Sequence, residues 1–214
     1  MFKYSQPVFY RFSEDSTFLA KKGVEFFCND LKTFDKDVVL FDGFCGCGVV
    51  GIEFLLSCEG KKRIQQGVFL EKNPNMISFC EMNLEQLRDE LKGNIPLELY
   101  NEDFFKFIFE KKLLASKIFF LINPPYFKEN IQRQPENEDR KKARFFGQEE
   151  SLEKIFLKID EISVPKKTAG IVLYRVDQED EEFVPNLRKK LRNISIFVEG
   201  NGSKKLVDLI YFKS

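Results

Sequence analysis

The stretch VVLFDGFCGCGVVGIEF, residues Val38 to Phe54, decides the fold. Its apolar beginning, Val38–Phe41, predicts a buried strand, and Val49–Cys58 predicts a helix. Between them residues 46–51 read GCGVVG, a GxGxxG turn. A strand, a glycine turn and a helix in this order favour a cofactor-binding loop at the carboxyl edge of a sheet. The alternative, that the glycines only permit tight packing of strand against helix, stays open.

Predicted strands and helices alternate along the rest of the chain, which is typical of a mostly parallel sheet. Two strand-like segments around the glycine-containing residues 199–203 predict a final hairpin. The sequence therefore predicts an α/β fold of the Rossmann-like type, with a seven-stranded, mostly parallel sheet and an antiparallel C-terminal hairpin strand. Besides the first strand, we expect strands at Gly67–Leu70, Leu97–Tyr100, Lys117–Ile122, Ala169–Val176, Ile194–Val198 and Leu206–Phe212. Besides the first helix, we expect helices from Pro74 to Gly93, over Asp103–Lys112 and around Leu152–Ile162. A further helix is expected in the lead-in segment, with Asp15 or Ser16 as its N-cap.

At 214 residues the chain is most simply one domain, residues 1–214, with a lead-in segment and helix at 1–36 and the core at 37–214. Lys and Arg together number 34, as do Asp and Glu, so no overall charge attracts nucleic acid or lipid. The longest apolar run, Ile118–Ile122, is too short to cross a membrane, and the N-terminus lacks the apolar segment of a signal peptide. We therefore expect a cytoplasmic protein with no membrane partner, and we expect a monomer.

The sequence contains no histidine. This excludes every mechanism that uses imidazole as a base, an acid or a metal ligand. The five cysteines form no CxxC pair and are an odd number, which is typical of core residues in a reducing compartment. We therefore predict neither a metal site nor a disulfide framework.

Acidic residues around the glycine turn indicate which cofactor it binds. Asp42 at the end of the first strand suits a cofactor with a cationic ammonium and sulfonium, and it would repel a pyrophosphate. Glu71 follows the second strand, where it is placed to accept hydrogen bonds from ribose hydroxyls. Asp103, after the third strand, offers an acid for an adenine amino group. These residues favour S-adenosylmethionine over a nicotinamide dinucleotide.

The tetrapeptide Asn123-Pro124-Pro125-Tyr126 ends the predicted strand Lys117–Ile122, which we place next to the first strand, where an open α/β sheet binds ligands. The Asn123 side-chain oxygen and the Pro124 carbonyl are two acceptors that can hold both N–H groups of a conjugated amine or carboxamide. Pro125 fixes the backbone, and Tyr126 offers a flat face for an extruded base. We predict that these four residues are catalytic, with a plain structural turn as the alternative.

The glycine loop resembles motif I of the Rossmann-like class I methyltransferases, with Phe44 in place of the first glycine. Asn-Pro-Pro-Tyr is shared by N6-adenine methyltransferases and by enzymes that methylate a glutamine in release factors. Residues 6–20, QPVFYRFSEDSTFLA, resemble the opening motif of the bacterial valine-tRNA (adenine-N6)-methyltransferase family. That resemblance implies N6-methylation of the adenine immediately 3′ of the anticodon, with tRNA as the partner.

Other interpretations remain beside this one. The glutamine-modifying enzymes carry an additional helical domain before motif I, which we do not expect here because the motif begins near residue 38. A different rRNA or DNA adenine-N6 methyltransferase stays open, as does a non-catalytic module that binds the cofactor or RNA.

The family pattern also implies how the cofactor is bound. Residues of the glycine turn would border its methionine part, Glu71 its ribose, and Asp103 with Phe104 its adenine, while residues of the lead-in segment would close over it. Arg11 as a surface cation and Asp15 as a helix cap are the alternatives. The implied cofactor-binding residues are Arg11, Ser13, Asp15, Asp42, Gly46, Gly48, Glu71, Asp103, Phe104 and Asn123.

A polar stretch of about twenty residues, 128–147, follows the tetrapeptide and is longer than ordinary loops. Its cations are predicted to bind RNA phosphates, with a solvated charged loop as the alternative. We assign no role to Phe145 or Phe146, and we interpret residues 61–63 as a solvated turn. The predicted RNA-binding residues are Lys128, Arg140, Lys141, Lys142 and Arg144.

Overall fold

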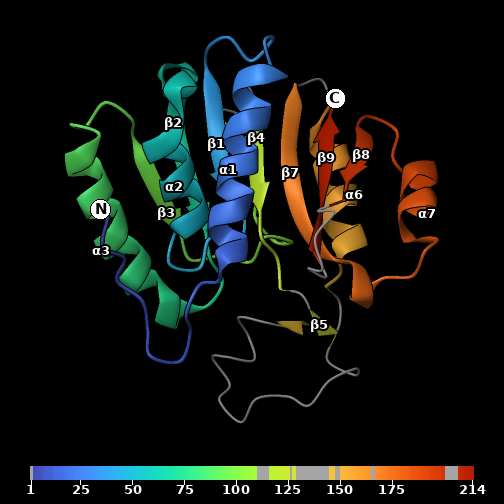
Figure 1. Cartoon of the computed structure of the whole chain (residues 1–214), viewed down its shortest axis with the longest axis horizontal. Helices are drawn as coiled ribbons and strands as arrows, with labels where there is room; N and C mark the ends of the chain where they lie inside the picture. The colour runs from blue at the N-terminus through green and yellow to red at the C-terminus, as the bar shows by residue number, and fades with distance from the viewer. Residues whose placement is uncertain are drawn as a thin grey trace.

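A computed structural model describes residues 2–109, 116–125, 127–128, 145–147, 150–164, 167–200 and 207–214. Seven strands form one sheet in the order β3-β2-β1-β4-β7-β9-β8 (Figure 1). Neighbours from β3 to β7 pair in parallel, whereas β9 is antiparallel to both β7 and β8. The predicted sheet is confirmed, including the strand before Asn123 beside the first strand. The strands are β1 (Val38–Asp42), β2 (Ile64–Leu70), β3 (Leu97–Tyr100), β4 (Lys117–Ile122), β7 (Thr168–Arg175), β8 (Ser195–Glu199) and β9 (Val207–Lys213).

Helices cover both faces of this sheet (Figure 1). On one face lie α1 (Glu14–Asn29), α2 (Val49–Ser57) and α3 (Pro74–Glu90), and on the other lie α6 (Leu152–Ile162) and α7 (Phe183–Lys190). Successive side chains of a strand point to opposite faces of the sheet. Strand β1 therefore contributes Leu40 to the core beneath α1, α2 and α3, and Phe41 to the core beneath α6 and α7. Burial on both faces explains why the strands read as continuous apolar runs.

Residues 103–109 form a turn, so the predicted helix is wrong there. The Asp103 carboxylate accepts a hydrogen bond from the Phe105 backbone N–H at 2.8 Å. Lys158 Nζ donates to the carbonyls of Phe105 and Phe107 at 2.8 and 2.9 Å. A continuing helix would have used these carbonyls for its own N–H groups, so the lysine ends the turn. The last three residues of that prediction lie outside the described part of the chain.

Helix α1 begins at Glu14 with Ser13 as its N-cap, so the predicted cap at Asp15 or Ser16 is wrong. Ser13 has an extended backbone, with φ −100° and ψ 171°, and therefore lies just outside the helix. As a consequence Ser16 falls within the first turn, where its side chain is buried against the sheet.

Arg63 fixes the other end of α1, so the interpretation of residues 61–63 as a purely solvated turn is wrong for this residue. Its guanidinium donates to the carbonyls of Phe27, Leu31 and Phe34 at 2.8, 3.1 and 3.2 Å. The same group lies 4.0 Å from the centre of the Phe27 ring. A cation on the last carbonyls of a helix complements its dipole, and α1 is thereby tied to the start of β2.

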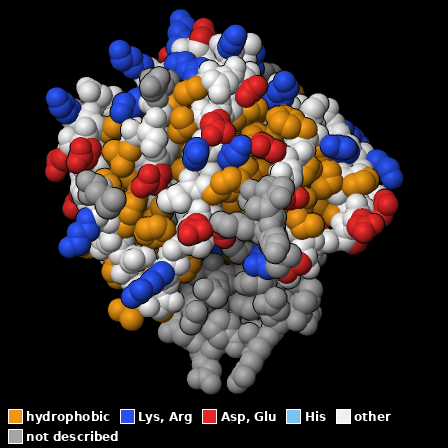
Figure 2. All heavy atoms as spheres, in the orientation of Figure 1, with side chains coloured by type: hydrophobic (Ala, Val, Ile, Leu, Met, Phe, Trp, Pro, Cys, Tyr) orange, Lys and Arg blue, Asp and Glu red, His pale blue; other side chains and the backbone are white. Residues whose placement is uncertain are grey.

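The surface carries charges of both signs. On the face drawn in Figure 2, Lys and Arg side chains alternate with Asp and Glu side chains over the described residues. Within the described ranges no helix has the length and apolarity that crossing a membrane requires, and no His, Cys, Asp and Glu side chains cluster as a metal site would need. All five cysteines are free, and four of them are buried.

Candidate active site

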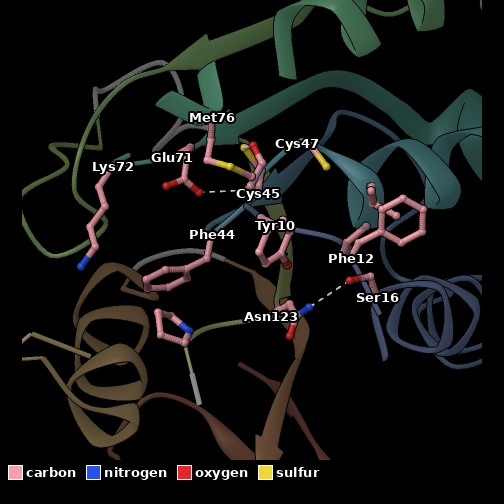
Figure 3. Close-up of a pocket in the computed structure, with 14 residues that line it drawn as sticks. Tyr10, Phe12, Ser16, Phe44, Cys45, Cys47, Glu71, Lys72, Met76 and Asn123 are labelled. Carbon is pink, nitrogen blue, oxygen red and sulfur yellow. Dashed lines mark hydrogen bonds between the residues drawn. The ribbon is translucent and has the colours of Figure 1, made fainter. Parts of the chain in front are cut away.

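A hollow of about 590 Å³, open to solvent, lies at the carboxyl ends of β1, β2 and β4 (Figure 3). Three parts of the chain meet there: the lead-in segment, the glycine turn and the residues that follow the strands. The residues that line it are Tyr10, Phe12, Ser16, Phe44, Cys45, Gly46, Cys47, Val49, Val50, Glu71, Lys72, Met76, Asn123 and Pro125.

The glycine turn binds a carboxylate of the protein itself. Gly46 and Gly48 have φ of +56° and +87°, a left-handed conformation that favours glycine, and Gly48 is the N-cap of α2. The Gly46 N–H donates to Glu71 Oε2 at 2.9 Å, while Glu71 Oε1 accepts from the Asn73 N–H at 2.7 Å. A dinucleotide loop would offer such an N–H to a phosphate. Here an anion would meet Glu71.

Asp42 lies behind the glycine turn and is completely buried. Its Oδ2 accepts from the Gly51 N–H at 2.9 Å, but Oδ1 has no hydrogen-bond partner among the described residues. Burial raises the pKa of Asp42 to about 7, the charge of Glu71 adds to the effect, and the Gly51 N–H opposes it. Burial also raises the pKa of Glu71, against the N–H groups of Asn73 and Gly46. A fully buried acid behind the turn and a partly buried acid in the pocket wall together favour a positively charged ligand in this place.

Lys72 is the cation that lines the pocket, and it is paired with an acid. Its Nζ lies 2.6 Å from both carboxylate oxygens of Glu150. Glu150 also accepts a hydrogen bond from the Gly147 N–H at 2.9 Å. Lys72 is therefore paired with Glu150, while its charge also acts to lower the pKa of Glu71 against the larger effect of burial.

The Asn-Pro-Pro bend separates this pocket from a smaller hollow of about 230 Å³. Asn123 and Pro125 line the large pocket, while Pro124 and Pro125 line the small one. The Asn123 Nδ2 group donates to Ser16 Oγ at 3.2 Å (Figure 3). The bend formed by residues 123–125 therefore lies between the large pocket and the small hollow. Tyr126 lies outside the described residues.

The predicted cofactor-binding residues fall into two groups. Gly46, Glu71 and Asn123 line the pocket. The others do not line it. Asp42 is buried behind the turn, and Gly48 within the turn is the N-cap of α2. Ser13 and Asp15 bind one another at 3.1 Å, and Arg11 is exposed. Phe104 is buried next to Asp103, with its ring 5.2 Å from that of Phe44.

The predicted RNA-binding residues lie almost entirely beyond the described chain. Lys128 belongs to β5 (Phe127–Lys128), which pairs in parallel with β6 (Phe145–Phe146). Arg140, Lys141, Lys142 and Arg144 fall outside the described residues.

Several lining residues were not predicted. Tyr10 and Phe12 flank Arg11 in the lead-in motif, and their aromatic character was the available indication. Phe44 was noticed only as a departure from a glycine, although its ring forms a wall of the pocket. Met76 and Ser16 carry no pattern of their own, since only the tertiary arrangement brings helices α3 and α1 to the site.

No family model matches the sequence, and no curated protein matches it. Solved structures do resemble it. The small RNA methyltransferase HEN1 matches with a TM-score of 0.59 at 13% identity, over 91% of this chain and 25% of that one. The N-terminal domain of human METTL16 in complex with SAH matches with a TM-score of 0.58 at 10% identity, over 100% of this chain and 75% of that one. An rRNA methylase from Streptococcus thermophilus matches with a TM-score of 0.49 at 15% identity, over 96% and 97%. The chain has the Rossmann-like fold of the first two methyltransferases.

Proposed function

We propose that this chain is an S-adenosylmethionine-dependent methyltransferase that acts on N6 of adenine in tRNA. The observation that carries the proposal is the Asn123-Pro124-Pro125 bend after β4, whose Asn123 and Pro125 line the large pocket. We infer that the Asn123 side-chain oxygen and the Pro124 carbonyl are two acceptors for an amine beside this pocket. For the target we propose the adenine immediately 3′ of the anticodon of a valine tRNA, on the resemblance of residues 6–20.

The charge of the pocket supports this cofactor. The buried Asp42 Oδ1 without a partner and the Glu71 carboxylate fit the ammonium and sulfonium groups of S-adenosylmethionine. A pyrophosphate would meet the same two acids, and the Gly46 N–H that it needs already binds Glu71. Phe12, with the other apolar residues of the wall, provides contact surface for an adenosine group. The similar METTL16 domain was crystallised in complex with SAH, which agrees with this assignment.

The residues of the bend would activate the substrate nitrogen. An amine conjugated to a ring is a weak nucleophile because its lone pair is delocalised. The Asn123 Oδ1 and the Pro124 carbonyl each accept one N–H of that amine, which localises the lone pair and turns it toward the pocket. S-adenosylmethionine supplies a methyl group on a positively charged sulfur. Since this leaving group is neutral, the chain needs no base before transfer, and the proton of the methylated amine passes to solvent. This agrees with a sequence without histidine.

Two further observations support RNA as the substrate. HEN1, which shares the fold, is a small RNA methyltransferase. The predicted cations of residues 128–147 follow the bend directly in the sequence, so they lie in the chain segment that leaves the site.

The test uses tRNA from cells that lack the protein. Purified enzyme and S-adenosylmethionine are expected to add N6-methyladenosine to it, as measured by mass spectrometry of nucleosides. The Asn123→Ala variant is the matched control and is expected to keep only a small residual rate. An Asn123→Ala variant with full activity would remove the acceptor from the mechanism.

Protein glutamine methylation is the second candidate, because the same two acceptors can hold a carboxamide nitrogen. The discriminating measurement is transfer of a labelled methyl group to a release factor in parallel with tRNA. Methylation of the protein with none of the RNA would replace the proposed substrate. If neither is labelled while the cofactor binds, the chain is a binding module.

A further inference from the structure

The orientation of the Asn123 amide decides whether this residue can accept a hydrogen bond from a substrate. An asparagine amide has almost the same shape in its two orientations, which exchange the oxygen acceptor with the NH₂ donor. With the oxygen toward the pocket it accepts an amine N–H. With the NH₂ group there, two donors would face one another and the amine would not bind.

Ser16 contacts the nitrogen end of this amide. The Asn123 Nδ2 group donates to Ser16 Oγ at 3.2 Å, so Oδ1 is directed away from helix α1 (Figure 3). Ser16 itself is only 3% exposed and lines the pocket. The reverse arrangement, with the hydroxyl donating to Oδ1, would place the NH₂ group where the acceptor is needed.

Helix α1 is held along β4, the strand that ends at Asn123, so the contact does not depend on one flexible side chain. Gly23 lies two turns beyond Ser16 on the same face of the helix, and a Cβ there would be 2.7 Å from Leu121 Cδ2. One turn further, the Phe27 and Phe119 rings are 5.0 Å apart. Glycine therefore permits the close approach of α1 to β4 at the level of Leu121, two residues before Asn123.

We propose that Ser16 is a positioning residue, which holds the Asn123 amide with Oδ1 toward the amine of the substrate. The proposal rests on the proposed function, since it gives the Asn123 oxygen a substrate to bind. It also gives the lead-in segment a part in the reaction: helix α1 sets the geometry of an acceptor that lies more than a hundred residues later in the chain.

The kinetic test compares Ser16→Ala with Ser16→Thr, which keeps the hydroxyl. Loss of the hydroxyl is expected to lower kcat by about twofold or more, with KM for tRNA and for S-adenosylmethionine nearly unchanged, because the amide then samples both orientations and only one accepts the amine. Ser16→Thr is expected to restore most of the rate. An unchanged kcat in Ser16→Ala would overturn the proposal, as would a loss confined to KM.

A double variant separates positioning from a general structural effect. If Ser16 acts through Asn123, adding Ser16→Ala to Asn123→Ala lowers the residual rate no further. Independent losses that multiply in the double variant would show that Ser16 acts on something else. If Ser16→Ala fails to fold in a thermal melt, Ser16→Cys, whose sulfur is a weak acceptor of similar shape, replaces it with the same expectation.

A readout without catalysis distinguishes failure of this proposal from failure of the proposed function. The side-chain amide signals of Asn123, assigned in ¹⁵N NMR spectra by their loss in Asn123→Ala, are expected to shift in Ser16→Ala and to return in Ser16→Thr. Signals that do not respond to Ser16→Ala would reject the contact even if tRNA is methylated. Signals that respond in a protein that methylates no tRNA would keep the contact and reject only the substrate.

Discussion

Two buried aspartates, Asp42 at the end of β1 and Asp160 in α6, differ greatly in the number of hydrogen bonds that their carboxylates accept. Both are at most 7% exposed. The Asp160 carboxylate accepts from the backbone N–H groups of residues 192–194 at 2.7 to 3.2 Å and from the Asn193 side chain at 3.1 Å. Asp42 accepts only from the Gly51 N–H, and its Oδ1 has no partner among the described residues.

The difference separates a residue of the scaffold from a residue of the site. A buried carboxylate that is surrounded by N–H donors holds its charge at no great cost, and it organises the backbone around it. A buried carboxylate with a single donor costs free energy in the protein without ligand. That cost is offset when a cation binds nearby. We therefore expect Asp42 to contribute to ligand binding and Asp160 to contribute to the stability of the fold.

The strongest test of this contrast is Asp160→Ala. It leaves three backbone N–H groups before β8 without their acceptor, so the free energy of unfolding is expected to fall by about 3 kcal/mol or more in denaturant titrations. Glu161→Ala, at the exposed neighbouring position on the same helix, is the control and should change it by less than about 0.5 kcal/mol. A stable Asp160→Ala variant would place Asp160 outside the scaffold.

The pH dependence of stability tests the other acid. Because the pKa of Asp42 is raised to about 7 in the folded protein, the folded state holds a proton that the unfolded chain releases at lower pH. The stability that the protonated Asp42 gives to the folded state is therefore present at low pH and is lost as the pH rises through 7. The pKa of Glu71 is also raised, so Glu71 changes the stability with pH in the same direction. Between pH 5 and pH 8 the ligand-free protein is expected to lose about 2.5 kcal/mol through Asp42.

The matched variant for this measurement is Asp42→Asn, which resembles the protonated acid. Thermal melts are expected to give it a higher stability than the wild type, with a difference that grows between pH 5 and pH 8. Parallel pH profiles of the two proteins would contradict an uncharged, under-bonded Asp42.

The same Asp42→Asn variant is expected to bind S-adenosylmethionine more weakly, by about tenfold or 1.4 kcal/mol, since a buried acid behind the pocket can then no longer carry a negative charge that attracts the cation. Isothermal titration calorimetry measures this. Asp160→Asn is the comparison: it should lower stability without changing the affinity of the folded protein. Equal affinities in wild type and Asp42→Asn would leave Glu71 as the acid that selects the ligand.

The arrangement of the sheet was predictable from the sequence because local patterns determined it. Apolar runs such as Lys117–Ile122 have the length of a buried strand, and the glycines of residues 46–51 mark the turn. The predicted helix is wrong over residues 103–109 because the carbonyls of Phe105 and Phe107 are taken by Lys158, which is more than fifty residues away. Arg63 was misinterpreted for the same reason, since its partners lie on α1 and in the segment that follows it, about thirty residues earlier in the chain.

The candidate site was predictable where chemistry and position in the sequence coincide. Glu71 and Asn123 end strands that meet at one edge of the sheet, and both line the pocket. Ser16 was considered only as a helix cap, because nothing near it in the sequence refers to Asn123. The sequence shows that Phe44 replaces a glycine of the motif, but it does not show that the Phe44 side chain lines the pocket. Contacts between distant segments have no local pattern, so the sequence alone does not reveal them.

The smallest effect is expected at Lys72, whose pair with Glu150 lies at the edge of the pocket with side chains 25% and 13% exposed. Removing the cation in Lys72→Met should change the free energy of unfolding by no more than about 1 kcal/mol, because partly exposed ion pairs contribute little. Affinity for S-adenosylmethionine should rise by about two- to threefold at low salt and approach the wild-type value in 0.5 M salt, since the pocket becomes more negative. A weaker affinity would mean that Lys72 itself contacts the ligand. A large loss of stability would instead show that this ion pair stabilises the fold, as Asp160 does. Glu150, at the edge of the pocket, would then be an acid of the scaffold and not of the ligand site.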